Sequence, residues 1–227
     1  MSRPDPHAAQ PIRTAGAPLG RAKGAVVMLH GRGASAASIL TLAEEFVQPD
    51  LAYLAPQASG STWYPYSFLA PLDRNEPYLS SALGAVERML GEIADGGIVA
   101  EQTVLLGFSQ GACLALEYAA RHAGRYGGVV ALSGGLIGNE QLVAVEPPAG
   151  KVFSYEGDLA GTPVFLGCSD VDAHIPLDRV QHSARTLRAL GGDVTERIYP
   201  GMGHTVNEDE IQFVRGLLSR LQTDTGQ

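Results

Sequence analysis

Short, nearly continuous apolar runs alternate with longer amphipathic segments along this chain, and no other feature constrains its fold as strongly. The runs predict strands over residues 24–31, 51–57, 103–109, 127–135, 162–170 and 194–200. The segments with helical spacing of apolar residues are 35–47, 77–94, 110–122, 177–190 and 207–221. Strands that are apolar throughout and joined by helices are typical of a parallel sheet with helices on both faces. The sequence therefore predicts an α/β fold with a mostly parallel sheet.

The size of the chain suits one buried domain. Its 227 residues, 45% of them hydrophobic, can bury one sizeable core but hardly two. No internal repeat or low-complexity linker divides it, so we predict a single domain over residues 1–227. Residues 1–20, rich in proline and alanine, are expected to form a poorly structured or extended N-terminal segment. They lack the apolar stretch of a signal peptide, and we expect a cytoplasmic protein without a membrane span.

Charge and cysteine content exclude several classes of protein. A net charge of −8 and the lack of a basic cluster argue against nucleic acid as a partner. Cys113 and Cys168 show no disulfide framework spacing, and we expect two small buried side chains. No metal-binding motif such as H-E-x-x-H occurs, so no metal is expected. The sequence leaves a homodimer open.

Two long segments, 58–77 and 136–161, interrupt the alternation of strands and helices. The first is rich in aromatic residues, and the second is compatible with a short helix. Each directly follows a predicted strand, and ligands of open parallel sheets bind beyond the carboxyl ends of the strands. Because long irregular loops in compact domains are often functional, we expect both to border a binding site.

The stretch Gly107-Phe108-Ser109-Gln110-Gly111 stands where a predicted strand turns directly into a helix. Gly-x-Ser-x-Gly in that context is the nucleophile elbow. So abrupt a turn strains the central residue, and glycine on each side removes the clashes of neighbouring Cβ atoms. Ser109 would project at a helix N-terminus, with the N–H of Gln110 placed to bind an oxyanion.

A serine hydroxyl needs a base, and the chain supplies one in the order serine, acid, histidine expected for this elbow. His204 follows the predicted strand 194–200. Asp170 and Asp172 follow the strand 162–170, and either could orient the imidazole. All of these lie beyond the carboxyl ends of strands, on the edge that carries Ser109.

The other histidines compete less well for the role of base. His7 falls in the leading tail, and His122 and His182 lie on predicted helices, where we expect them to be solvated. His30 ends an apolar strand and is expected to be a hydrogen-bonded structural residue. His174 is nearer the site and is a candidate pocket wall.

Four motifs in order, HGRGAS, GFSQGA, SDVDAHIP and GMGH, resemble the phospholipase/carboxylesterase family of α/β-hydrolases, which also contains the acyl-protein thioesterases. The resemblance runs from about Gly24 to the C-terminal helix. It implies a minimal α/β-hydrolase fold without a large cap domain, no cofactor, and hydrolysis of carboxylic esters or thioesters.

The resemblance also assigns two further roles. The family's catalytic aspartate begins an Asp-Pro-x-Val-Pro-like motif, which here reads Asp172-Ala173-His174-Ile175-Pro176, so Asp172 is preferred over Asp170. Alanine replaces the usual proline. The residue after His-Gly supplies the second oxyanion N–H, which corresponds to Arg32. The Arg32 side chain is expected either to reach an anionic group of the substrate or to point to solvent.

The aromatic loop offers candidate walls for the substrate pocket. These are Trp63, Tyr64, Tyr66 and Phe68, although half of them could simply pack under the loop. A modest pocket of this kind favours small or medium acyl esters over whole phospholipids.

The predicted activity is therefore that of a serine hydrolase that cleaves carboxylic esters through an acyl-enzyme. An acyl thioesterase or lysophospholipase is the main alternative, and a triad-bearing binding protein without turnover is the non-enzyme alternative. The pattern Gly31, Gly33, Ala36 also matches a dinucleotide fingerprint. Asp50, its acid, precedes a strand instead of ending one, so that interpretation fails.

Overall fold

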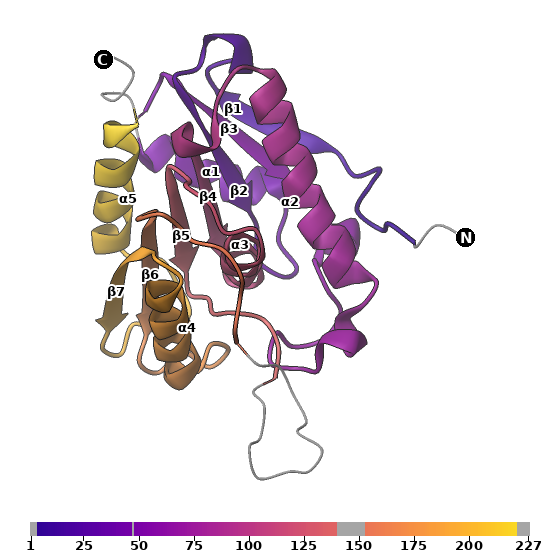
Figure 1. Ribbon diagram of the computed structural model, residues 1–227, viewed down its shortest axis with the longest axis vertical. Coiled ribbons are helices and arrows are strands. Elements are labelled where there is room, and N and C mark those ends of the chain that lie inside the picture. Colours follow the sequence, from indigo (N-terminus) through magenta and orange to yellow (C-terminus); the bar gives the residue numbers. More distant parts are fainter. Residues whose placement is uncertain (1–3, 47, 140–152, 222–227) are drawn as a thin grey trace.

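A seven-stranded sheet forms the centre of the computed structural model, which describes residues 4–46, 48–139 and 153–221 (Figure 1). Across the sheet the order is β1-β3-β2-β4-β5-β6-β7. Pairing from β3 to β7 is parallel, and only β1 runs antiparallel, against β3. The strands are β1 (Ile12–Gly16), β2 (Gly24–Leu29), β3 (Leu51–Pro56), β4 (Thr103–Phe108), β5 (Gly128–Leu132), β6 (Pro163–Ser169) and β7 (Asp193–Tyr199).

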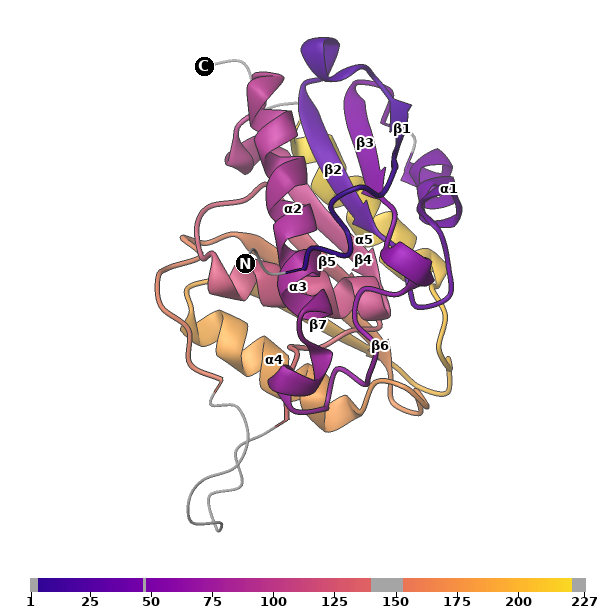
Figure 2. The ribbon, with the colours of Figure 1, turned by 90° about the vertical axis from the view of Figure 1, so that its right-hand side faces the viewer.

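Helices cover both faces of this sheet, as Figures 1 and 2 show. One face carries α2 (Tyr78–Asp95), α3 (Gln110–Arg121) and α4 (Leu177–Ala189), and the other carries α1 (Ala36–Phe46) and α5 (Glu208–Arg220). Successive residues of a strand point to opposite faces. In β2, accordingly, Ala25, Val27 and Leu29 join the core under α2 and α3, whereas Val26 and Met28 join the core under α1 and α5. The predicted α/β fold with a mostly parallel sheet is confirmed.

Most predicted elements agree with the structure to within a few residues, and the edge strand β1 is the main omission. Its sequence, IRTAG, is largely exposed and has no apolar run, so nothing local predicts a strand. Pairing with β3 forms it, and the N-terminal segment is extended there. A second difference concerns β5, which ends at Leu132 because Ser133 turns the chain with a φ of 55°.

The aromatic loop after β3 contains two short 3-10 helices, η2 (Ser59–Ser61) and η3 (Leu72–Asn75), before α2 begins. Of the second predicted loop, residues 140–152 lie outside the described residues. Its described flanks, 136–139 and 153–161, contain no helix. Among residues 4–46, 48–139 and 153–221, no helix has the length and apolar character needed to cross a bilayer.

Candidate active site

The strand β4 turns into α3 at Ser109, whose backbone has φ 54° and ψ −117°. Few residues other than glycine adopt a positive φ, and a serine held there marks a site of local strain. Glycine is required on both sides of it. A Cβ atom at Gly107 would overlap the backbone of Gly111, and one at Gly111 would overlap the carbonyl group of Leu29. The turn therefore depends on close backbone contact between β2, β4 and α3.

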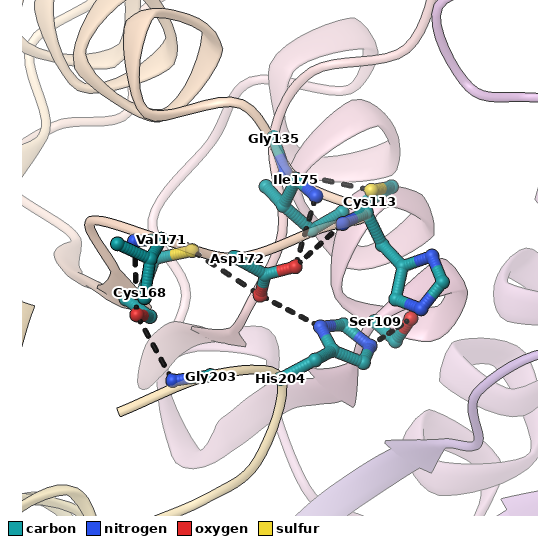
Figure 3. Close-up of polar contacts among 11 residues, drawn as sticks. Ser109, Cys113, Gly135, Cys168, Val171, Asp172, Ile175, Gly203 and His204 are labelled. Carbon is teal, nitrogen blue, oxygen red and sulfur yellow. Dashed lines mark hydrogen bonds and ion pairs between the residues drawn. The ribbon is translucent and has the colours of Figure 1, made fainter. Parts of the chain in front are cut away.

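Ser109, His204 and Asp172 form a continuous chain of hydrogen bonds (Figure 3). The Oγ atom of Ser109 lies 2.9 Å from Nε2 of His204, and Nδ1 of His204 lies 2.7 Å from Oδ2 of Asp172. The rings of Phe108 and His174 pack against the imidazole, with centroids 5.0 and 4.8 Å from its own. The imidazole is thus held by hydrogen bonds and by ring contacts in the orientation that reaches the serine.

Asp172 is buried at the side chain, and its second oxygen accepts two backbone N–H groups. Oδ1 lies 2.8 Å from the nitrogen of His174 and 3.1 Å from that of Ile175. Burial alone would raise the pKa of this carboxyl, but hydrogen bonds from His204 and from the two backbone N–H groups lower it below its usual value. The carboxylate therefore stays ionised beside His204.

Asp170, the other candidate acid, has a different position. Its Oδ1 accepts a hydrogen bond from the backbone N–H of Gly201 at 2.8 Å. Nearby, the Ser169 hydroxyl accepts from the N–H of Gly203 at 3.1 Å. Both contacts tie the end of β6 to the loop that carries His204, so Asp170 meets the backbone of that loop and Asp172 meets the imidazole.

A hollow of about 470 Å³ opens over Ser109, and Arg32 and Gln110 line it together with the serine. Gly31, which precedes Arg32, comes so close to the elbow that a Cβ atom there would lie 3.5 Å from Cβ of Ser109. The two residues predicted to supply oxyanion N–H groups are thus brought to Ser109 from β2 and from the start of α3.

The Arg32 side chain is exposed at the hollow, and it has a role that the sequence did not predict, because it holds the aromatic loop. Its guanidinium donates hydrogen bonds to Thr62 Oγ1 at 3.0 Å and to the carbonyl oxygens of Tyr64 at 3.0 Å, Pro65 at 3.0 Å and Tyr66 at 2.7 Å. Each of the two terminal nitrogens of the guanidinium donates two of these four hydrogen bonds. A planar fork with many donors is suited to such a cluster of carbonyl groups. Nothing in the local sequence signals this contact, since its acceptors lie some thirty residues away.

The Gln110 side chain also holds this loop. Its Oε1 accepts from the backbone N–H of Trp63 at 2.9 Å, and its Nε2 donates to the carbonyl of Tyr64 at 2.8 Å. Both residues predicted to supply an oxyanion N–H therefore use their side chains to fix residues 62–66. The position of the aromatic loop is coupled to the position of the two N–H groups.

Four of the five predicted pocket walls line the hollow, namely Tyr64, Tyr66, Phe68 and His174. Trp63 does not, and its prediction as a wall is wrong. Its side chain is 0% exposed, and its indole N–H donates to the carbonyl of His30 at 2.9 Å. Alternate residues of a loop can point to the core or to the cavity, and the sequence does not encode that choice.

His7 is also corrected by the structure, since it lies in no free tail. It is buried, it packs 5.5 Å from the Trp63 ring, and its Nε2 lies 3.0 Å from the carbonyl of Trp63. The backbone N–H of Ser59 donates to its Nδ1 at 3.0 Å. The N-terminal segment thus packs against the aromatic loop through His7.

The remaining histidines lie outside the hydrogen-bonded chain of Ser109, His204 and Asp172. His30 is buried and hydrogen-bonded, as predicted, with its Nδ1 2.8 Å from the carbonyl of Gly31. His122 is exposed, as predicted. His182 is half-buried against the ring of Phe153, 4.9 Å between centroids, which its prediction as a solvated residue did not foresee.

Both cysteines are free and buried. Burial raises the pKa of each thiol to about 12. Cys113 lines the hollow one turn beyond Ser109, and the Sγ atom of Cys168 lies 3.7 Å from Oδ2 of Asp172 (Figure 3). Because the thiolate is the reactive form, neither cysteine is suited to act as a nucleophile.

Two other kinds of ligand, a dinucleotide and a metal ion, can be compared with the described residues. Asp50, the acid of the dinucleotide fingerprint, pairs with Lys23 at 2.9 Å near the amino end of β3, whereas the elbow follows the carboxyl end of β4. The described part of the chain holds no group of three or more His, Cys, Asp or Glu side chains that could bind a metal ion.

Comparison with known proteins adds an independent finding. The model of the phospholipase/carboxylesterase family matches residues 16–222. A crystal structure of a phospholipase/carboxylesterase from Dyadobacter fermentans is 46% identical, with a TM-score of 0.84, and the match covers 93% of this chain and 97% of that one. Acyl-protein thioesterase 1 of Yarrowia lipolytica is 31% identical over 83% of this chain and 88% of its own length. Acyl-protein thioesterase 1 of Gibberella zeae is 32% identical over 126 residues, and there the chain spans about half of the relative, 51% of its length.

Proposed function

The chain belongs to the phospholipase/carboxylesterase family of hydrolytic enzymes, and we propose that it is a serine carboxylesterase that cleaves small or medium acyl esters through Ser109, His204 and Asp172. The observation that carries the proposal is the chain of hydrogen bonds from Ser109 through His204 to Asp172, built on a strained elbow beside a hollow. Each link has the length and the partners that acyl transfer requires.

In the proposed first step, the Oγ atom of Ser109 attacks the ester carbonyl carbon as His204 Nε2 removes the hydroxyl proton. Asp172 keeps Nδ1 of the imidazole protonated and stabilises the imidazolium that forms. The negative charge that develops on the carbonyl oxygen is bound by the backbone N–H groups of Arg32 and Gln110. Each such donor contributes on the order of 3 kcal/mol to stabilising the transition state.

The tetrahedral intermediate then collapses. The bond from carbon to the alcohol oxygen breaks, and the alcohol leaves with the proton held by His204, so that the acyl group remains on Ser109. In the second half, His204 removes a proton from water, the hydroxide oxygen attacks the acyl carbon, and Ser109 recovers its proton as the acid is released. The chain's own residues suffice for every proton transfer.

The dimensions of the hollow support a modest acyl group. A volume of about 470 Å³ with walls from Tyr64, Tyr66 and Phe68 accommodates a small or medium acyl chain. The thioesterase alternative rests on the similarity to acyl-protein thioesterases in fungi. Oxygen esters and thioesters pass through the same acyl-enzyme, so the site chemistry alone serves both.

The testing experiment is a chain-length series of p-nitrophenyl esters and matching thioesters, with Ser109→Ala as the control. We expect hydrolysis of short and medium oxygen esters and no turnover by the variant. A preference for long acyl thioesters would replace the carboxylesterase assignment with that of a thioesterase. If neither series is turned over, labelling by a fluorophosphonate is the deciding measurement, because only an activated serine reacts. A labelled Ser109 would indicate an enzyme whose substrate lies outside the two series, and an unlabelled one would indicate a binding protein without turnover.

A further inference from the structure

A second hollow opens beside the catalytic residues, on the side of α1. Its volume is about 270 Å³, and it shares Gly31, Ala34, Phe108 and His204 with the larger hollow over Ser109. We call it the α1 hollow. Its remaining walls come mainly from α1 and from the segment after His204, namely Ser38, Ile39, Thr41, Leu42, Thr205 and Val206.

We propose that the α1 hollow binds the alcohol part of the ester, and that this alcohol is uncharged and mostly apolar. The inference rests on the proposed function, since it assigns the two hollows to the two parts of the substrate that Ser109 separates.

The position of the reacting atoms assigns the acyl group to the larger hollow. The acyl carbon bonds to Oγ of Ser109, and its oxygen must reach the N–H groups of Arg32 and Gln110. All three residues line the larger hollow, and none of them is among the residues that line the α1 hollow. The acyl chain therefore extends along the aromatic walls.

The alcohol oxygen has a different requirement, because it must take its proton from Nε2 of His204 as the bond to carbon breaks. His204 lines both hollows. His174 packs against the imidazole from the larger hollow, whereas Thr205 and Val206 lead from His204 into the α1 hollow. An alcohol that leaves next to His204 thus finds its space along α1.

The walls of the α1 hollow determine which alcohol fits. Ile39, Leu42 and Val206 are apolar, and the polar walls other than the two histidines are hydroxyl groups. Within the described part of the chain, no Lys, Arg, Asp or Glu lines it. The remaining titratable wall besides His204 is His30, whose pKa is lowered by burial, so it is neutral.

An alcohol or thiol that carries phosphate groups, such as coenzyme A, would find no cation there to replace its water. The volume of about 270 Å³ is also below the ~300–1,000 Å³ typical of sites for drug-sized ligands. We therefore expect leaving groups of the size of hexanol or benzyl alcohol.

The test keeps the acyl group constant and varies the alcohol. Butanoate esters of methanol, butanol, hexanol and benzyl alcohol are compared with butanoyl coenzyme A, for wild type and for Thr41→Trp. Thr41 is an exposed residue of α1, so an indole there fills the hollow without disturbing the core. Ala37→Trp is the matched control, because Ala37 is exposed on the same helix and does not line the hollow.

We expect kcat/KM of the wild type to rise from the methyl ester to the hexyl and benzyl esters and to be low for coenzyme A. In Thr41→Trp the hexyl and benzyl esters should lose roughly tenfold or more in kcat/KM, the scale on which apolar pockets discriminate, while the methyl ester and the Ala37→Trp protein behave as wild type. The deacylation rate must not change, because the alcohol has already left.

Two results would overturn the inference. One is a Thr41→Trp protein whose preference for acyl length changes while its preference for alcohols does not. The other is a wild type that favours butanoyl coenzyme A over the neutral esters. Failure of the proposed function is seen separately, as the absence of a fluorophosphonate adduct on Ser109 in the wild type.

Discussion

At the scale of single residues, the two neighbouring aspartates show how backbone contacts assign a role. Asp172 accepts two backbone N–H groups on Oδ1 and presents Oδ2 to His204. Asp170, two residues earlier, uses Oδ1 to hold the N–H of Gly201. The same side-chain type thus orients an imidazole at one position and a loop at the other.

This difference gives a paired prediction. Asp172→Asn keeps the shape of the side chain but removes the charge that stabilises the imidazolium and the acceptor that fixes its tautomer, and we expect kcat to fall on the order of 10⁴-fold. Asp170→Asn keeps an oxygen for the N–H of Gly201, so its kcat should remain close to that of the wild type. Steady-state kinetics on one p-nitrophenyl ester measures both. Equal losses in the two variants would contradict the assignment of Asp172.

At the scale of elements, the aromatic loop is held in place by the side chains of Arg32 and Gln110. Removing the Arg32 guanidinium releases the carbonyl groups of Pro65 and Tyr66 and allows this part of the loop to move, while the Tyr64 carbonyl keeps its hydrogen bond from Gln110. A displacement of about 1 Å near reacting groups can cost roughly 100-fold in rate. We therefore expect Arg32→Met to lower kcat/KM by about 10- to 100-fold, mainly through kcat, since the loop then no longer holds residue 32 and its backbone N–H in place.

Arg74→Met is the matched control for this prediction. Arg74 lies over the face of the Tyr66 ring, 4.4 Å from its centroid, and it does not line the hollow over Ser109. The measurement compares kcat and KM of both variants, with and without added guanidinium ion. Partial rescue of Arg32→Met by guanidinium is expected. A change confined to KM, without rescue, would argue for a role in substrate binding alone.

The contrast between local and long-range contacts also explains what the sequence could predict. The ranges of α1 to α5 and of the parallel strands follow from apolar spacing, which is a local signal. Ser109 and its glycines are predictable because the whole Gly-x-Ser-x-Gly motif lies within five neighbouring residues, although Gly111 is also required by a distant contact with the backbone of Leu29. By contrast, β1 forms through pairing with β3, and Trp63 turns inward to meet His7 and His30. Such pairings depend on chain reversals that no local pattern encodes.

At the scale of the whole molecule, buried titratable groups at two places bind protons differently in the folded and unfolded states. His7 and His30 accept backbone N–H groups of Ser59 and Ala58 on one ring nitrogen, which requires neutral imidazoles. Burial lowers the pKa of both below the ordinary value of 6.5, and Asp5 and Arg88 act on His7 in opposite directions. The stability from these histidines is therefore present above about pH 6.5 and is lost as the pH falls below it.

Glu210, at the start of α5, acts in the opposite direction. It forms a capping box with Asn207, and within the described residues its Oε1 has no hydrogen-bond partner. Burial raises its pKa from 4.5 to about 7. Its folded-state pKa thus exceeds the unfolded one, so the stability it contributes is complete below pH 4.5 and is lost as the pH rises through 7. The loss amounts to on the order of 3 kcal/mol.

The two groups can be separated by measuring the free energy of unfolding from pH 4.5 to 9, with fluorescence as the probe. Trp63, the single tryptophan, packs against both histidines and reports on their surroundings. His7→Gln should flatten the loss of stability on the acid side, whereas the exposed His122→Gln should not.

Glu210→Gln keeps the cap but cannot ionise, so it should gain stability relative to the wild type at pH 8 and little at pH 4.5. If Glu210→Gln instead loses stability equally at both pH values, the carboxyl acts only through the cap, and its ionisation does not shape the stability curve.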